Sequence, residues 1–372
     1  MKKINWKSVA GWVVAIAVIL GVIGYNAYEN EKQTTSGKIK VYTLLPLSGS
    51  AAAFGQQAKK SIDYAIQKEE YPFDIVYVDS ESEPMKGLTA LQSQTISQDK
   101  PIVLSMMSSV GSVVAPYVDQ KKGFLFAIVA QSIAADVASY QKVTNPIPDI
   151  LNPLVNWIIK SYKKIDVVYL MDEYGLAEKN YLVNQLRKNN FDNINELALP
   201  LNVKDPKNEV VKLLSTNPEA IIILGNPTLG YINLFKELHL QDFKGDIMAD
   251  GTLMQPFVQK SLQSYANGTI GIANMPDIET ELTTEQKNLK EELEKVGLRA
   301  YILPVQTIDA LKLIKYTIEN NLPFERKTYE NLKNWKSISG DPVSFKDGES
   351  SYKPYLVRYS DEKFYLLDEE KQ

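Results

Sequence analysis

Short apolar segments alternate with amphipathic segments along most of this chain, and this alternation restricts the fold more than any other feature of the sequence. Within 58–66, apolar residues recur at spacings of three and four, which is typical of a helix with one buried face. The apolar runs between such segments are short, and proline, glycine or charged residues bound them. The first of these predicted strands lie at 38–45, 73–80, 101–106 and 123–129. Strand–helix–strand repetition predicts parallel sheets covered by helices on both faces.

A segment at 139–153 interrupts the alternation. It contains three prolines, and because residues before proline avoid the helical region, we predict an extended conformation there. The alternation then restarts, and it is followed by two helical segments and a strand-rich C-terminal part with a Lys-Asp-Gly turn. The predicted strands after the break lie at 165–171, 194–201, 219–226, 245–250 and 268–277. With 372 residues, the chain is long enough for two doubly wound lobes, which would cross near 145–150 and 274–277 and bind a ligand in a cleft at the strand ends.

The N-terminal residues predict the compartment. Three lysines precede an uncharged run at 8–28, which is about the length that spans a bilayer, and a polar linker follows at 29–37. Residues 1–28 are therefore either a signal peptide or an uncleaved signal anchor, and the poor cleavage pattern around Tyr25 and Ala27 favours the anchor. The lysines place the later residues outside the cytoplasm. We expect an extracytoplasmic protein, in the periplasm or at the cell surface, that residues 8–28 tether to the cytoplasmic membrane.

The composition excludes several kinds of functional site. The chain has no cysteine and a single histidine, His239, which excludes thiolate nucleophiles, cysteine-ligated metals and most histidine-based sites. A net charge of −4 offers no basic surface for nucleic acid. The sequence contains no dinucleotide fingerprint, phosphate-binding loop or Gly-x-Ser-x-Gly elbow. We therefore expect no enzymatic activity, no catalytic residue, no metal, no cofactor and no nucleic-acid partner.

Five stretches in a fixed order carry a resemblance to a known family. They are PLSGSAAAFGQQAKKSIDYAI (46–66), DEYG (172–175), MADGTLMQPFVQ (248–259), NGTIGI (267–272) and VSFKDGE (343–349). With them, the chain from about residue 38 to residue 368 resembles the type I periplasmic (solute) binding proteins. The similarity is to the leucine/isoleucine/valine-binding branch of ABC-transporter substrate-binding proteins.

This resemblance implies two lobes that a multi-strand hinge joins and that close on a small ligand. Lobe one would comprise 38–145 and 277–341, and lobe two would comprise 146–276 and 342–372. It also implies a monomeric receptor that captures a small molecule, most often an amino acid, and presents it unchanged to the permease of an ABC importer. The alternative that stays open is a membrane-tethered ligand-sensing or scaffold domain of the same fold with no transport role.

Seven residues correspond to ligand-contacting positions of these proteins. They are Phe54, Ser109, Ala130, Ser132, Tyr174, Thr228 and Asp250. By resemblance, Ser109 would donate its hydroxyl to a ligand carboxylate, Ser132 would offer its hydroxyl and N–H, and Ala130 would offer its backbone groups. Tyr174 and Thr228 would reach the ligand from lobe two, where Asp250 would pair with an ammonium group. Phe54 would overhang the cleft from lobe one.

Six of these residues, all except Ala130, also have a purely structural alternative. The serines, Thr228 and Asp250 lie where helix N-caps and Asx turns are common. Phe54 can instead pack on the following helix as a hydrophobic staple, and Tyr174 can be a half-buried surface residue. His239 lies beside leucines on a predicted helix, so we expect it to pack rather than to bind a ligand.

Overall fold

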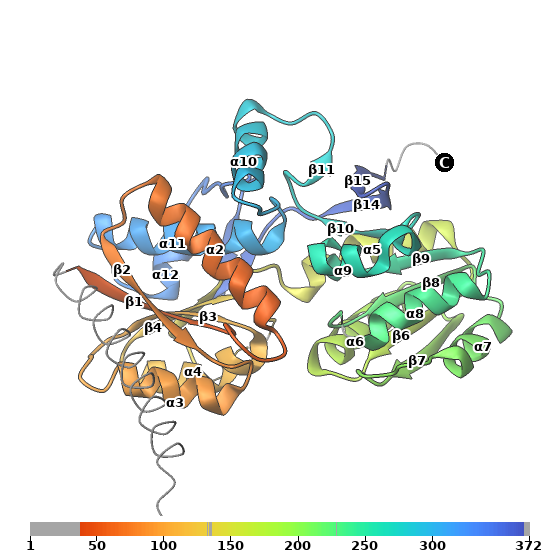
Figure 1. Cartoon of the computed structure of the whole chain (residues 1–372), viewed down its shortest axis with the longest axis horizontal. Coiled ribbons are helices and arrows are strands. Elements are labelled where there is room, and N and C mark those ends of the chain that lie inside the picture. Colours follow the sequence, from red (N-terminus) through yellow and green to blue (C-terminus); the bar gives the residue numbers. More distant parts are fainter. Residues whose placement is uncertain (1–37, 132, 134–135, 228, 368–372) are drawn as a thin grey trace, which may run out of the picture.

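The computed structural model describes residues 38–131, 133, 136–227 and 229–367, and it shows two α/β lobes side by side (Figure 1). The predicted fold of two doubly wound, largely parallel lobes is confirmed. Within these residues, no helix combines the length and the apolar character that crossing a membrane requires. The signal anchor or signal peptide expected at 1–28, and the linker after it, lie outside the described residues.

The first lobe is built on a sheet of five parallel strands in the order β2-β1-β3-β4-β5. Its strands are β1 (Ile39–Leu45), β2 (Phe73–Asp79), β3 (Ile102–Met106), β4 (Phe124–Ile128) and β5 (Tyr140–Lys142). Along β1, Val41 and Leu45 enter one hydrophobic cluster, whereas Tyr42 and Leu44 enter another. This period of two is what a strand covered on both faces requires, so the sheet has a core on each side.

Helices cover both faces of this sheet. Helices α2 and α11 pack together on one face, and α3 and α4 pack together on the other (Figure 1). The helices of this lobe are α2 (Ala52–Lys68), α3 (Pro84–Gln94), α4 (Ser108–Gln120), α10 (Thr284–Lys295), α11 (Ile302–Glu319) and α12 (Arg326–Glu330). A hairpin of β12 (Ser344–Lys346) and β13 (Glu349–Ser351) contacts β5 and α12. The sequence predicted that lobe two resumes at residue 342. The hairpin instead packs against the first lobe.

The second lobe is built on an eight-stranded sheet in the order β11-β15-β14-β10-β9-β8-β6-β7. Its strands are β6 (Ile165–Leu170), β7 (Ile194–Leu199), β8 (Ala220–Leu224), β9 (Asp246–Ala249), β10 (Ile270–Ala273), β11 (Ile278–Glu279), β14 (Tyr355–Ser360) and β15 (Lys363–Leu366). Strands β6 to β10 are parallel, and β14 adds to β10 in the antiparallel sense. The C-terminal strands β14 and β15 therefore extend a sheet whose first strand along the chain, β6, begins at Ile165.

Helices also cover both faces of the second sheet. Helices α5 and α6 share a hydrophobic cluster on one face, while α7, α8 and α9 pack on the other. Their bounds are α5 (Ile147–Ser161), α6 (Glu173–Lys188), α7 (Lys207–Ser215), α8 (Leu229–Leu240) and α9 (Pro256–Leu262). Two short 3₁₀ turns, η1 (Gly251–Met254) and η2 (Gln263–Ala266), flank α9.

The proline-rich segment differs from its prediction. It is helical from Ile147 onward, because Pro148 occupies the first turn of α5 and Pro153 is accommodated inside the helix. Proline is favoured in a first turn, where its missing N–H has no intrahelical partner to lose and its φ already suits a helix. These prolines therefore mark the start of a helix, and the extended conformation predicted for 147–153 is wrong.

Three segments connect the lobes, after β5, β11 and β13. Asn145, in the first connection, is buried, and its side chain joins the first connection to the third. Its Nδ2 donates to the carbonyl oxygen of Tyr352 at 3.1 Å, and its Oδ1 accepts from the N–H of Tyr352 at 2.8 Å. One side chain thus satisfies both backbone groups of a buried residue and holds two of the connections together.

Arg299 links the two lobes close to the second connection. It lies just before α11, and its Nη2 is 2.9 Å from Oδ2 of Asp277, a buried carboxylate between β10 and β11. Its Nη1 donates to the side chain of Gln259 in α9. Because the carboxylate is buried, this guanidinium is the charge that makes its ionised form tolerable.

Candidate functional site

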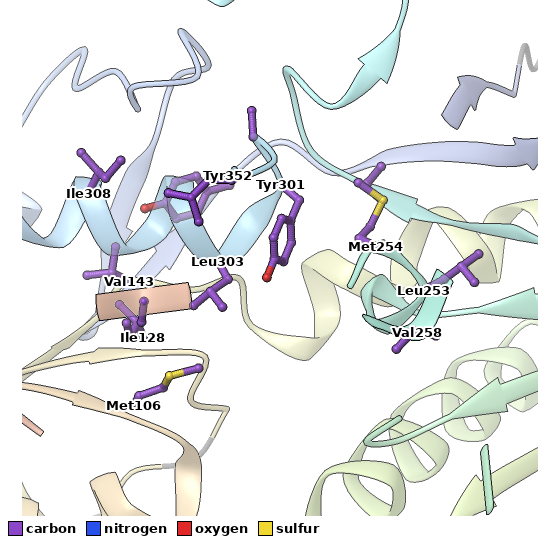
Figure 2. Packing of buried hydrophobic residues seen from close by; sticks show 14 of the residues in the cluster. Met106, Ile128, Val143, Leu253, Met254, Val258, Tyr301, Leu303, Ile308 and Tyr352 are labelled. Atoms are coloured by element: carbon purple, nitrogen blue, oxygen red, sulfur yellow. The ribbon is translucent and has the colours of Figure 1, made fainter. Parts of the chain in front are cut away.

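The two lobes touch where the chain leaves β1 and β9. Phe54 lies in the first turn of α2, and its ring centroid is 5.1 Å from that of Phe257 in α9, with the ring planes at 80°. Tyr301 of the first lobe and Met254 of the second are also buried on the sides of the lobes that face each other (Figure 2). The staple alternative for Phe54 does not fit its place in the helix, because a staple joins the residue before the N-cap to the fourth helical residue.

The aromatic contact between the lobes gives a direct test of this arrangement. Edge-to-face rings contribute about 0.5–1.5 kcal/mol beyond the area that they bury. We expect the unfolding free-energy losses of Phe54→Ala and Phe257→Ala to sum to more than the loss in the double variant, by that amount, in guanidinium titrations. The control pairs Phe54→Ala with Phe243→Ala, since no ring contact joins these two side chains, and its losses should add. Additive losses in both pairs would show that the lobes are not joined there.

The first-lobe turn that follows β3 offers groups for an anion. The N-cap of α4 is Met107, which has no capping side chain, and Ser109 is the second helical residue. No described residue bonds the hydroxyl of Ser109, whereas Ser108 accepts a hydrogen bond from the N–H of Gln131 at 2.9 Å. A carboxylate at this end of α4 would meet free N–H groups, the Ser109 hydroxyl and the positive end of the helix dipole.

The turn after β4 is built differently. Ala130 is fully buried, and the residue before it, Val129, has a φ of +48°. Met107 also has a positive φ, of +79°. Such a conformation costs of order 1–3 kcal/mol for a residue with a β-carbon, so the two adjacent strand ends hold strained backbone. Ser132, the next predicted contact, lies outside the described residues.

The second-lobe residues cluster at the ends of β6 and β9. Tyr174, partly buried, is the second residue of α6, whose N-cap is Asp172. Asp250 is fully buried, and its Oδ1 accepts from the N–H of Thr252 at 2.9 Å, as an N-cap to η1. The Asx-type role therefore accounts for Oδ1 of Asp250, whereas Oδ2 receives no geometric hydrogen bond from the described residues. Thr228 lies outside the described residues.

A further acidic residue joins this cluster. Glu178 is fully buried in α6, and its Oε2 accepts from the N–H of Gly225 at 3.1 Å. Sequence reasoning did not find Glu178, although one signal was available. It lies four residues after Tyr174 and four before the buried Leu182, on the helix face that packs against the sheet.

Burial shifts the titration of the whole cluster. Burial raises the pKa of Glu178 and of Asp250. The charge of Asp250 raises the pKa of Glu178 further. Burial and the two neighbouring carboxyls also raise the pKa of Tyr174. All three shifts favour the neutral form of the group concerned.

His239 and possible metal ligands are the remaining candidates for a functional site. The ring of His239 packs against Tyr265, with centroids 5.6 Å apart, and its Nδ1 lies 2.9 Å from the carbonyl oxygen of Phe235, as expected for a packing residue. Among the described residues, no group of three or more histidine, aspartate or glutamate side chains could hold a metal ion.

Comparison with known proteins gives a family and a fold. A family model described as "Periplasmic binding protein" matches residues 38–303. Comparison of the sequence with curated proteins gives no match.

Among solved structures, a leucine-binding protein from Thermotoga maritima has a TM-score of 0.77 at 16% identity, over 89% of this chain and 98% of that one. A solute-binding protein of an ABC transporter from Rhodopseudomonas palustris, in complex with 4-hydroxybenzoate, has a TM-score of 0.75 at 19% identity, over 89% and 96%. An amino acid ABC transporter substrate-binding protein from Pseudomonas fluorescens has a TM-score of 0.74 at 16% identity, over 90% and 95%. At these identities the likeness is one of fold.

Proposed function

The chain belongs to the periplasmic binding protein family, and on that premise we propose that it is an extracytoplasmic receptor that binds a small carboxylate-bearing ligand between its lobes and presents it to an ABC importer. An amino acid is the ligand class that the two faces of the site support best. The ligand leaves unchanged, since the described strand ends offer recognition groups and no nucleophile–base pair. Tethering by residues 8–28 stays a prediction.

This proposal is supported by the unlike groups that the two lobes carry at their strand ends, together with the Phe54–Phe257 contact between the lobes. On the first lobe, the start of α4, which has no capping side chain, and the hydroxyl of Ser109, which no described residue bonds, suit a carboxylate. On the second lobe, Tyr174 and two acidic side chains suit a positive or hydrogen-bond-donating group. A free α-amino acid carries a carboxylate and an ammonium group on one carbon. A single small ligand of this class could therefore reach the groups of both lobes.

The relatives support a carboxylate in particular. The Thermotoga protein is named for leucine, the Pseudomonas protein for amino acids, and the Rhodopseudomonas protein was solved with 4-hydroxybenzoate. Each of these ligands carries a carboxylate, whereas the rest of the molecule differs. The first-lobe face would thus bind the shared group, and the second-lobe face would decide between an amine and an aromatic acid.

Thermal unfolding of the chain against a library of amino acids and aromatic acids tests the proposal. A ligand present at about 100 times its dissociation constant should add roughly 2.7 kcal/mol to the unfolding free energy. Ser109→Ala and Tyr174→Phe should each weaken the ligand so found by about tenfold, which is the loss of one good hydrogen bond, and leave the ligand-free midpoint in place. Ser93→Ala, at an exposed serine of α3 that bonds only its own helix, is the matched control.

One observation favours the alternative role as a sensing or scaffold domain. Buried apolar residues of both lobes form one continuous cluster, which includes Tyr301 and Met254. Lobes fixed together by such a cluster would not open for a ligand. A library in which no compound moves the midpoint would support that role and contradict the receptor.

A further inference from the structure

Gln131 follows Ala130 in the turn after β4, and hydrogen bonds join it to three other segments of the chain. Its N–H donates to Oγ of Ser108, the first residue of α4, at 2.9 Å. Its Nε2 donates to the carbonyl oxygen of Asn145, in the first connection between the lobes, at 3.0 Å. Its carbonyl oxygen accepts from Nζ of Lys142, the last residue of β5, at 2.7 Å. Gln131 therefore bonds both to the turn after β3 and to the start of the first connection.

Two of these partners extend the bonding to the third connection. Asn145 bonds both backbone groups of Tyr352, which lies in that connection. Lys142 is buried, and its Nζ is 2.7 Å from Oε2 of Glu349 in β13, the strand that leads into the third connection. A buried ammonium group is costly without its acceptors, so Lys142 holds Gln131 and β13 at a fixed separation.

On the cleft side, the bonds of Gln131 reach strained backbone. Met107 and Val129 are the two residues with positive φ in the turns after β3 and β4. The N–H of Met107 donates to the carbonyl oxygen of Ile128 at 3.3 Å, and Gln131 bonds the same two turns together beyond the strained residues. Backbone of this kind persists only where the surrounding structure holds it. A displacement of either turn would therefore act on Gln131 and, through it, on two of the connections.

We propose that Gln131 is a positioning residue that couples the two first-lobe turns to the angle between the lobes. A ligand carboxylate at the start of α4 displaces the turn after β3, and the bonds of Gln131 transmit this displacement to the first and third connections. The coupling is reciprocal, so a change at the connections alters the turns as well. The ligand part of this inference rests on the proposed function, whereas the coupling between the turns and the connections does not.

Distances between the lobes test the coupling without any ligand. The chain has no cysteine, so Thr89→Cys in α3 and Lys188→Cys in α6, both at exposed positions, place one spin label on each lobe. We expect Ser108→Ala, which changes only the cleft side, to lengthen the label distance in double electron–electron resonance by about 2 Å or more. The lobes are in contact here, and a weakened network lets them part. Gln131→Met should have the same effect, and Gln94→Met, at an exposed glutamine of α3, should have none.

Hydrogen exchange tests the opposite direction, from the connections to the cleft. Lys142→Met removes the ion pair on the connection side, and we expect the backbone amides at 107–111 to exchange severalfold faster. Lys333→Met, at an exposed lysine of the first lobe, should leave their exchange unchanged.

The thermal midpoint separates coupling from a purely structural role of Gln131. Gln131→Met loses one hydrogen bond but also removes Oε1, which is buried and has no donor among the described residues. We therefore expect a midpoint close to that of the wild type. A residue that only supports the fold would lower the midpoint and leave the distances and the exchange unchanged.

L-leucine is the probe for the ligand part. Saturating L-leucine should narrow the wild-type distance distribution, and Gln131→Met should reduce this change and weaken binding severalfold. Unchanged distances in both Ser108→Ala and Gln131→Met overturn the coupling, whatever binds. L-leucine that binds without altering the distances overturns the ligand part and leaves the receptor intact. If the variants alter the distances but no member of the amino acid and aromatic acid library binds, the coupling stands, and the ligand part fails together with the proposed function.

Discussion

Gly55→Ala is expected to lower the free energy of unfolding by about 3 kcal/mol and to abolish binding of any cleft ligand. A β-carbon at Gly55 would lie 2.1 Å from the carbonyl oxygen of Pro46 and 2.5 Å from its carbonyl carbon. Both are backbone atoms at the end of β1, so neither can move without moving the strand end or the start of α2. The shift would carry Phe54, the adjacent residue, away from Phe257. Guanidinium unfolding and ligand-induced midpoint shifts measure the two effects.

Gly251→Ala is the matched control for this substitution. It also lies at a strand end facing the other lobe, but the nearest atom to its added β-carbon is 3.9 Å away. We expect its unfolding free energy to stay within about 1 kcal/mol of the wild type, which is the range of an unstrained substitution. Equal losses of unfolding free energy at Gly55 and Gly251 would show that the close approach of α2 to β1 does not require a glycine at position 55.

Asp309→Asn is expected to stabilise the protein at neutral pH by up to about 3 kcal/mol and to leave it unchanged near pH 4. Asp309 is fully buried in α11, and burial raises the pKa of its carboxyl from 3.8 to about 6. Because the folded pKa lies above the unfolded one, the folded state holds the proton more tightly. This contribution to stability is complete below about pH 4 and is lost as the pH rises toward 6.

Asparagine keeps the hydrogen bonds of this site without the charge. The N–H of Ile338 donates to Asp309 Oδ1 at 2.8 Å, and the hydroxyl of Ser337 donates to Oδ2 at 2.6 Å. The amide oxygen can accept the first bond, and the amide nitrogen can donate to the serine oxygen. Urea unfolding at intervals from pH 4 to 8 measures the difference between variant and wild type. That difference should grow between pH 4 and 6 for Asp309→Asn and stay flat for the exposed Asp242→Asn.

The sequence predicted the layers of the fold better than its turns. Strand runs such as 101–106 and 219–226 are largely apolar because both faces of their sheets are covered, and they lie within a residue or two of β3 and β8. The prolines around α5 led to a wrong prediction of extended chain, because proline is common both at helix starts and in extended segments. Only the packing of that helix on the second sheet distinguishes the two.

The candidate site was harder to read because its contacts join distant parts of the chain. Small residues around Phe54 suggested a tight turn, but only the structure shows that Gly55 lies against Pro46 and that the ring meets Phe257. Glu178 was missed because a glutamate in a helical segment is ordinarily solvated, and local spacing does not reveal that it faces a second carboxyl. Tyr174 and Asp250 were found by resemblance, and their contact with a ligand stays a prediction.

The order of the elements along the chain has a consequence for how this protein is made. Helix α11 covers the first sheet, and β14 lies in the second sheet beside β10. A growing chain therefore lacks part of both hydrophobic cores until almost all of it has been synthesised, since β14 and β15 end the described fold. Incomplete cores keep the nascent chain loose and delay its compaction until these last strands are available to complete the second sheet.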